Sequence, residues 1–161
     1  MSKLIHGAAL ALLLGPDLAA AQDFDVGLKS YNSGHYANAV REWRSLAKRG
    51  NARSQRALGI MYLDGLGVEQ SDLEAVRWFR ASAVQGDATG QYNLAYMYQE
   101  GRGVVQSYVT AHMWFNVASA NESAPALEAR NKLARKMSSD TIAEAQRRAR
   151  VCLESGFQDC D

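Results

Sequence analysis

The side chains that most often carry out catalysis do not form a catalytic set in this sequence. The three histidines, His6, His35 and His112, stand far apart, and the Asp and Glu residues are scattered singly. No pair of carboxylates can therefore be assigned to acid–base chemistry. The patterns His-Glu-x-x-His, Gly-x-Ser-x-Gly and the phosphate loop with its lysine are absent. We predict that the protein is not an enzyme and has no catalytic residue, metal ligand or cofactor.

The two cysteines, Cys152 and Cys160, lie eight positions apart near the end of the chain. Their spacing is not Cys-x-x-Cys and no histidine is near them, which favours a structural disulfide over a redox or metal-binding pair. Gly156 lies between them and can supply the turn. In an oxidising compartment, closing so short a loop stabilises a fold by roughly 2–3 kcal/mol.

The first 21 residues have the pattern of a cleaved signal peptide. Lys3 is followed by a short apolar stretch around 8–14, then by Pro16 and by small residues at 19–21. We expect cleavage before Gln22 and a mature chain in the periplasm or outside the cell. The alternatives are an uncleaved anchor and a buried helix. The remaining chain has no apolar run long enough to span a bilayer, so we expect no stable membrane insertion.

The overall charge balance excludes two classes of binding protein. The chain of 161 residues has 18 Lys and Arg against 17 Asp and Glu, a formal net charge of +1. Nucleic-acid binders and polybasic membrane-surface proteins usually have a basic excess. Two prolines and 13 glycines also exclude collagen-like and proline-rich disordered chains. The length fits one domain, and no nucleic-acid partner is expected.

The middle of the chain repeats itself with a period of 36 residues. Shifting the sequence by this distance places 50–85 on 86–121. A period in the thirties is typical of stacked helical hairpins. The identical positions are Gly50/Gly86, Ala52/Ala88, Gln55/Gln91, Leu58/Leu94, Met61/Met97, Tyr62/Tyr98, Gly65/Gly101, Gly67/Gly103, Val68/Val104, Gln70/Gln106, Ser71/Ser107, Ala75/Ala111, Trp78/Trp114 and Phe79/Phe115.

Each unit predicts two helices joined by a glycine-containing turn. Ala75, Trp78 and Phe79 share one face of the second helix, at spacings of three and four residues. Glycine in the connection permits a positive φ and ends the first helix, and Ser71 or Ser107 can cap the second. The Gly-x-Gly pairs lack the preceding strand and third glycine of a dinucleotide site, so we interpret them as turns.

The flanking segments predict further hairpins. Ala39 and Trp43 precede Ala75 and Phe79 by 36 residues, whereas Tyr31 precedes Tyr62 by only 31. This predicts an N-terminal hairpin over 22–49 with a shorter connection and a tight turn at 34–35. Two more helices, over 124–136 and 141–153, are expected in the capping region 122–161. A helix that ends a solenoid needs a polar outer face, and the last predicted helix has one.

The repeated motif resembles that of the Sel1-like repeat family, a relative of the tetratricopeptide repeat. It reads Leu58-Gly59-x-Met61-Tyr62-x-x-Gly65-x-Gly67-Val68, followed by Ala75-x-x-Trp78-Phe79. The second copy departs from it, because Ala95 replaces the glycine of the first helix. The resemblance implies an all-α fold: a right-handed α-solenoid of antiparallel helix hairpins, with capping helices at the C-terminal end. It also implies an adaptor or interaction scaffold of the kind often found in the bacterial envelope or in signalling and host contact, so we expect an envelope or signalling protein as its partner.

In a solenoid of this type the first helices line the concave surface. If Leu58 and Leu94 face the core, the opposite face of each first helix is the candidate binding surface. Tyrosine offers a large contact area with a hydroxyl, and arginine offers several donors. The alternative is that curvature packs these side chains against a neighbouring helix or the N-terminal hairpin. The candidate residues are Arg53, Arg56, Ile60, Leu63, Thr89, Tyr92, Tyr96 and Gln99.

The preferred functional hypothesis is a non-catalytic adaptor of the bacterial envelope that binds a partner protein through this concave face. A second hypothesis is a cell-wall enzyme or binding protein that recognises β-lactams or peptidoglycan. Relatives linked to that chemistry have a cysteine pair in each repeat, and the segment 50–121 has none. A third is self-assembly end to end. The charged last helix and the closed tail instead predict a capped monomer.

Overall fold

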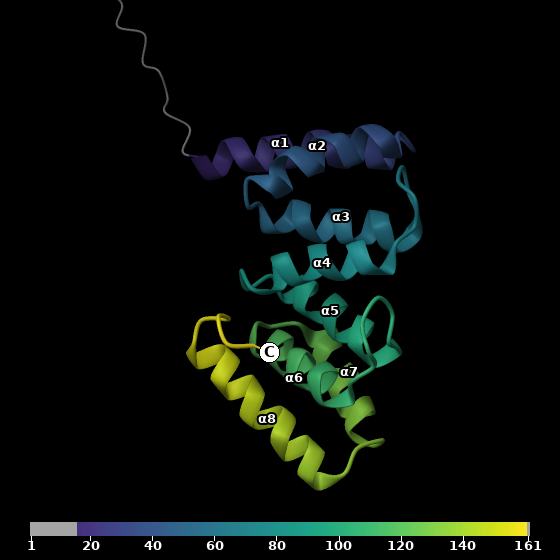
Figure 1. Ribbon diagram of the computed structural model, residues 1–161. Coiled ribbons are helices and arrows are strands. Elements are labelled where there is room, and N and C mark those ends of the chain that lie inside the picture. The colour runs from purple at the N-terminus through teal and green to yellow at the C-terminus, as the bar shows by residue number, and fades with distance from the viewer. Residues whose placement is uncertain (1–15, 161) are drawn as a thin grey trace, which may run out of the picture.

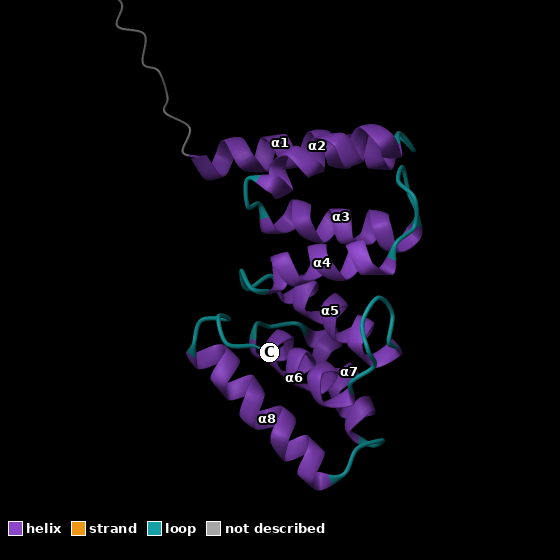
Figure 2. Cartoon of the chain, in the orientation of Figure 1, coloured by secondary structure: helices purple, strands orange, loops and turns teal. Residues whose placement is uncertain are grey.

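The computed structural model describes the backbone of residues 16–160 and the side chains of 23–160. Within that range the chain forms helices and no strand, as Figures 1 and 2 show, so the predicted all-α class is confirmed. Successive helices run antiparallel and stack as hairpins into a solenoid. The helices are α1 (Pro16–Asn32), α2 (Tyr36–Lys48), α3 (Ala52–Asp64), α4 (Asp72–Ala83), α5 (Ala88–Glu100), α6 (Tyr108–Ala120), α7 (Ala124–Ala134) and α8 (Ser139–Glu154).

The first helix, α1, includes residues on both sides of the cleavage site that the sequence predicts before Gln22. The described part of α1 includes residues 16–21, which belong to the predicted signal peptide. Cleavage before Gln22 would remove 16–21 from α1. The part that remains includes Phe24, which is buried against Trp43. The other residues of the predicted signal peptide, 1–15, lie outside the described chain.

The glycine turns position each repeat on the one before it. Gly67 and Gly103, 36 residues apart, both have φ near +70°. A side chain on Gly67 would meet the backbone of Tyr36 at the start of α2, and one on Gly103 would meet the backbone of Asp72 at the start of α4. Only glycine satisfies both the positive φ and the close approach. The predicted Gly-x-Gly turns are therefore inter-repeat contacts as well as helix ends.

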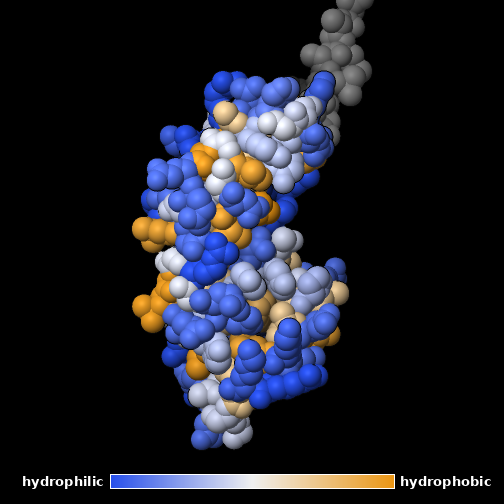
Figure 3. All heavy atoms as spheres, turned by 90° about the vertical axis from the view of Figure 1, so that its right-hand side faces the viewer, coloured by the Kyte–Doolittle hydropathy of each residue, from blue (hydrophilic) through white to orange (hydrophobic). Residues whose placement is uncertain are grey.

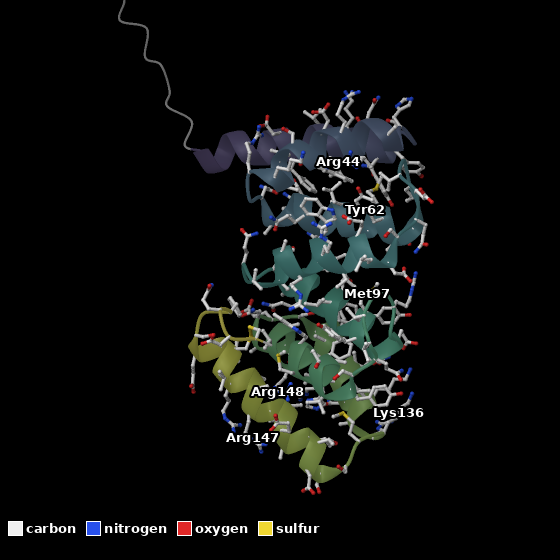
Figure 4. All side chains as sticks on the ribbon, viewed as in Figure 1. Arg44, Tyr62, Met97, Lys136, Arg147 and Arg148 are labelled. Carbon is white, nitrogen blue, oxygen red and sulfur yellow. A yellow bond between two sulfur atoms is a disulfide. The ribbon has the colours of Figure 1, made fainter. Side chains whose placement is uncertain are left out.

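Side-chain hydrogen bonds between repeats also recur with the 36-residue period. Gln55 Nε2 donates to the carbonyl oxygen of Ala47 at 3.1 Å, and Gln91 Nε2 donates to that of Ala83 at 3.0 Å. Arg44 on α2 donates to the hydroxyl of Tyr62 on α3 at 2.9 Å, and Figure 4 shows the two side chains pointing toward one another. Each bond links a second helix, or its end, to the first helix of the next repeat.

The C-terminal helix departs from the repeating arrangement. α8 packs against α6 rather than against its sequence neighbour α7. Ala145, Ala149 and Cys152 are buried there, while Arg147 and Arg148 extend from the outer side of α8 (Figure 4). A disulfide joins Cys152 to Cys160, whose Cα atoms are 4.5 Å apart. The last helix and its closed tail therefore cover one end of the solenoid.

Candidate binding surface

The eight candidate residues occupy four repeat positions, and the structure extends these positions to α7. α3, α5 and α7 begin at residues 52, 88 and 124, again 36 residues apart. The same four positions therefore recur on three first helices, and we call these twelve positions the candidate face. They are 53, 89 and 125 (Arg, Thr, Pro); 56, 92 and 128 (Arg, Tyr, Glu); 60, 96 and 132 (Ile, Tyr, Lys); and 63, 99 and 135 (Leu, Gln, Arg).

The two arginines of α3 both have partners within the chain. The guanidinium of exposed Arg53 lies 4.0 Å from the centroid of the Phe24 ring, a cation–π contact. Arg56 Nε forms an ion pair with Asp87 Oδ2 at 2.9 Å, and both side chains are mostly buried. Asp87 also caps α5, where it accepts a hydrogen bond from the Thr89 backbone at 3.1 Å. Arg56 thus joins α3 to the start of α5.

Three candidate residues are partly buried against the hydrophobic core. Ile60, Leu63 and Tyr92 pack on the cluster that includes Phe79 and Phe115. The ring centroids of Tyr92 and Phe115 are 5.5 Å apart. For these three side chains the geometry matches the packing alternative. Thr89 is exposed, Gln99 is half-buried, and Tyr96 is 40% exposed, so the polar groups of these three side chains are accessible to solvent.

An apolar groove lies on the N-terminal part of the candidate face. This N-terminal groove has a volume of about 200 Å³. Phe24 and Trp43 stack at 5.4 Å in its wall, and the Trp43 indole donates to the Phe24 carbonyl at 3.2 Å. Arg56 is its one charged residue. It is lined by Phe24, Leu28, Tyr31, Trp43, Arg56, Ala57, Ile60 and Met61.

A more polar groove lies between α5 and α7. This C-terminal groove has a volume of about 300 Å³ and contains Tyr96, the exposed aromatic residue of the candidate face. A carboxylate and an ammonium group, from Glu128 and Lys132, stand along its α7 side. It is lined by Tyr92, Tyr96, Gln99, Phe115, Pro125, Glu128, Ala129 and Lys132. The two grooves thus bring together five of the eight predicted residues with neighbours from other helices, and Arg53 contacts Phe24 in the wall of the first.

Several groove residues were not among the predicted ones. The apolar spacing of Phe24, Leu28 and Tyr31, at four and three residues, is the sequence signal that marks this face of α1. Glu128 and Lys132 continue the 36-residue period of Tyr92 and Tyr96, but their residue types differ, so identity matching does not find them. Arg53, Leu63 and Thr89 line neither groove.

The titratable groups of the described chain do not gather into a reactive site. His112 is buried on α6, where desolvation and then the positive charge of Arg130 lower its pKa below 6.5. On α8, hydrogen bonds from Arg148 and the charges of Arg147 and Arg148 lower the pKa of Glu144. Within 23–160 no three His, Cys, Asp or Glu side chains are placed to hold a metal ion. No helix in the described residues is long and apolar enough to cross a membrane.

The fold and the candidate face define a helical-repeat solenoid, and proteins of this class commonly bind partners along extended repeat surfaces. The family model of the Sel1 repeat matches residues 52–87 and 88–123. These units have the 36-residue length delimited in the sequence and begin two residues later. The chain therefore carries two Sel1 repeats. Proteins with this repeat typically mediate protein–protein interactions and are generally non-enzymatic scaffolds.

Two solved structures resemble this solenoid. One is a protective antigen of uropathogenic Escherichia coli with an SLR fold, 27% identical with a TM-score of 0.80, and the match covers 86% of this chain and 31% of the antigen. The other is a Sel1 repeat protein from Oxalobacter formigenes, 28% identical with a TM-score of 0.64, covering 70% of this chain and 88% of that one.

One characterised relative shares part of the sequence. It is the exopolysaccharide production negative regulator of Rhizobium leguminosarum bv. viciae, 44% identical over 52 residues. The match covers 32% of this chain and 20% of the regulator. The similarity is thus confined to a stretch about the length of one and a half repeats.

Proposed function

We propose that this protein is a non-catalytic adaptor of the bacterial envelope that binds a segment of a partner protein through the concave face of its solenoid. The observation that carries the proposal is the exposure of Tyr96 in the C-terminal groove. A half-exposed tyrosine above a packed aromatic floor offers apolar area and a hydroxyl together, which suits protein recognition. The predicted partner-binding residues remain Arg53, Arg56, Ile60, Leu63, Thr89, Tyr92, Tyr96 and Gln99.

Two features support a location in the periplasm or outside the cell. One is the signal-peptide pattern of 1–21, and the other is the disulfide of the tail, since disulfides persist in oxidising compartments. The Rhizobium relative is named as a regulator rather than as an enzyme, which favours a regulatory adaptor. The proposed protein is a monomer without a cofactor, and it binds neither nucleic acid nor a membrane stably.

Crosslinking in the living cell tests this proposal. A photo-crosslinking residue at Tyr96 should capture one dominant envelope protein, identified by mass spectrometry. The matched position is Arg150, which is exposed on α8, away from both grooves. Equal capture at both positions, or capture at Arg150 alone, would place the binding surface elsewhere.

A pair of variants gives an independent test with purified protein. Replacing Tyr96→Ala and Lys132→Ala together removes the exposed groove contacts without opening the core, so the far-UV helical signal should be unchanged. Capture of the crosslinked partner should be lost. Leu73→Ala is the control, because Leu73 is 61% exposed and lines neither groove. Full capture by a folded double variant would rule out the C-terminal groove.

A further inference from the structure

A third concave site lies on α2, away from the candidate face. It is a hollow of about 470 Å³ between α2 and the loop that follows α3. Ala37, Val40 and Val68 contribute apolar surface, and Arg41, Arg44 and Lys48 contribute positive charge. No carboxylate and no aromatic ring lines it. We call this site the basic hollow.

The three cations form a row along one side of α2. Residues at spacings of three and four lie on the same side of a helix, so Arg41, Arg44 and Lys48 face the same way. Arg44 is fixed by its hydrogen bond to the hydroxyl of Tyr62, and no carboxylate of the described residues forms an ion pair with its guanidinium. Arg41 contacts the Asn38 amide oxygen at 3.2 Å and the Glu42 carboxylate at 3.7 Å, both on the exposed surface of α2.

The next repeat lacks this row although it keeps the same framework. Arg80 stands 36 residues after Arg44 and donates to Tyr98 in the same way. Arg77, the counterpart of Arg41, lies 2.6 Å from the Glu74 carboxylate, whereas Arg41 lies 3.7 Å from that of Glu42. The counterpart of Lys48 is Val84. The excess of cations is therefore a property of α2 and not a consequence of the repeat architecture.

We infer that the basic hollow binds an acidic segment of a partner protein that also carries an apolar side chain. Carboxylates of the segment would pair with Arg41, Arg44 and Lys48, and charge-assisted pairs with arginine are the stronger kind of hydrogen bond. The apolar side chain would rest on Ala37 and Val68. This site is separate from the concave face, so the inference does not depend on the proposed function.

Two other anionic partners fit the hollow less well. A polysaccharide would find no aromatic ring on which to stack, since none lines the hollow. An anionic membrane would find no exposed large hydrophobic residue on α2 to insert into the lipid, and membrane-surface helices normally have such residues. Both partners serve as competitors in the experiment.

The probe is a fluorescein-labelled peptide of alternating acidic and apolar character, Glu-Leu-Glu-Glu-Leu-Glu, measured by fluorescence polarisation with the full mature protein. The peptide should bind, and the version with Gln in place of Glu should not. The variant R41A/K48A should bind about tenfold more weakly. The matched control K29A/R150A removes the same charge at exposed positions outside the hollow and should bind like the native protein.

A subtler variant tests the fixed arginine. Tyr62→Phe keeps every charge but releases Arg44, so binding should weaken by about threefold. Tyr96→Ala should leave peptide binding unchanged, which separates this site from the C-terminal groove. Equal weakening by K29A/R150A would show unspecific attraction and overturn the inference. Tighter competition by alginate or by phosphatidylglycerol vesicles than by unlabelled peptide would also overturn it, in favour of a polysaccharide or a membrane.

Discussion

The N-terminal and C-terminal grooves use the same face of the solenoid but differ in chemistry. The N-terminal groove is the smaller, about 200 Å³ against about 300 Å³, and aromatic and aliphatic side chains form nearly all of it. The C-terminal groove combines Tyr96 with the charges of Glu128 and Lys132. A ligand crossing both would need an apolar group for the first groove and polar groups for the second.

The difference shows that the two sides of each first helix have different roles: one side packs in the core, and the other faces outward. On the inward side the residue types are kept, as Leu58 and Leu94 or Met61 and Met97 show, and all four are fully buried. On the outward side the types change at every step, with Ile60 followed by Tyr96 and Lys132. The inward side maintains the stacking geometry, and the outward side is free to determine which ligand chemistry each groove accepts.

The largest expected loss of stability comes from removing the aromatic wall of the N-terminal groove. Trp43→Ala deletes a buried indole that stacks on Phe24 and donates to its carbonyl, so we expect a loss of about 3–5 kcal/mol. Because contacts in a solenoid join neighbours, hydrogen exchange should accelerate in α1 and α2 and change little in α5 to α8. Uniform acceleration along the whole chain would contradict two separable regions.

At the C-terminal end of the solenoid, the corresponding test is to remove the disulfide between Cys152 and Cys160. The double variant C152S/C160S should lose roughly 2–3 kcal/mol, since the cross-link no longer restricts the unfolded chain. The loss should appear in α8 and α6 by hydrogen exchange, while the N-terminal groove keeps its protection. Adding a reductant to the native protein should reproduce the effect, and a reductant should not affect the double variant.

A third prediction separates packing from recognition within the C-terminal groove. Tyr92→Ala should cost about 1–3 kcal/mol because the ring packs on Phe115 and the core. Tyr96→Ala should change stability by about 0.5 kcal/mol or less, since the side chain is 40% exposed. Thermal unfolding of the two variants measures the contrast. Equal losses would mean that Tyr96 is a packing residue and not a recognition residue.

The smallest expected effect is a pH dependence confined to the C-terminal half. The pKa of His112 is lowered by burial and by Arg130, whereas the unfolded chain binds the proton near pH 6.5. Below pH 6.5 the unfolded state therefore holds more protons, so stability is full above that pH and falls as the pH drops through the lowered pKa. His112→Gln should flatten the profile between pH 7.5 and 5. His35→Gln, at an exposed turn, is the matched control.

Most of the secondary structure could be predicted because it depends on local signals. Ser71, Ser107 and Ser138 cap α4, α6 and α8. The tight turn at 34–35 is also present, with Gly34 at φ 75°. These features follow from the apolar period and from residue types that suit helix ends. They require no knowledge of how distant segments pack.

The parts that were not predicted depend on contacts between distant segments. Nothing in the pattern of 139–154 determines that α8 packs on α6 instead of α7. The N-terminal groove needs the position of α1 relative to α3, and the ion pair of Arg56 needs that of Asp87. The candidate positions could thus be listed from the period alone, whereas the neighbours that bury or pair each side chain could not.

The recurring contacts between repeats also make the distance between the two grooves adjustable. Each repeat meets the next through the same glycine approach and the same glutamine hydrogen bond, at Gly67 and Gly103 and at Gln55 and Gln91. A duplicated 36-residue unit placed after α4 would therefore find matching contacts on both sides. Such an insertion would move the apolar groove away from the charged one by one repeat without altering either. The distance between the two grooves can therefore change in evolution by whole repeats, while the residues that line each groove stay the same.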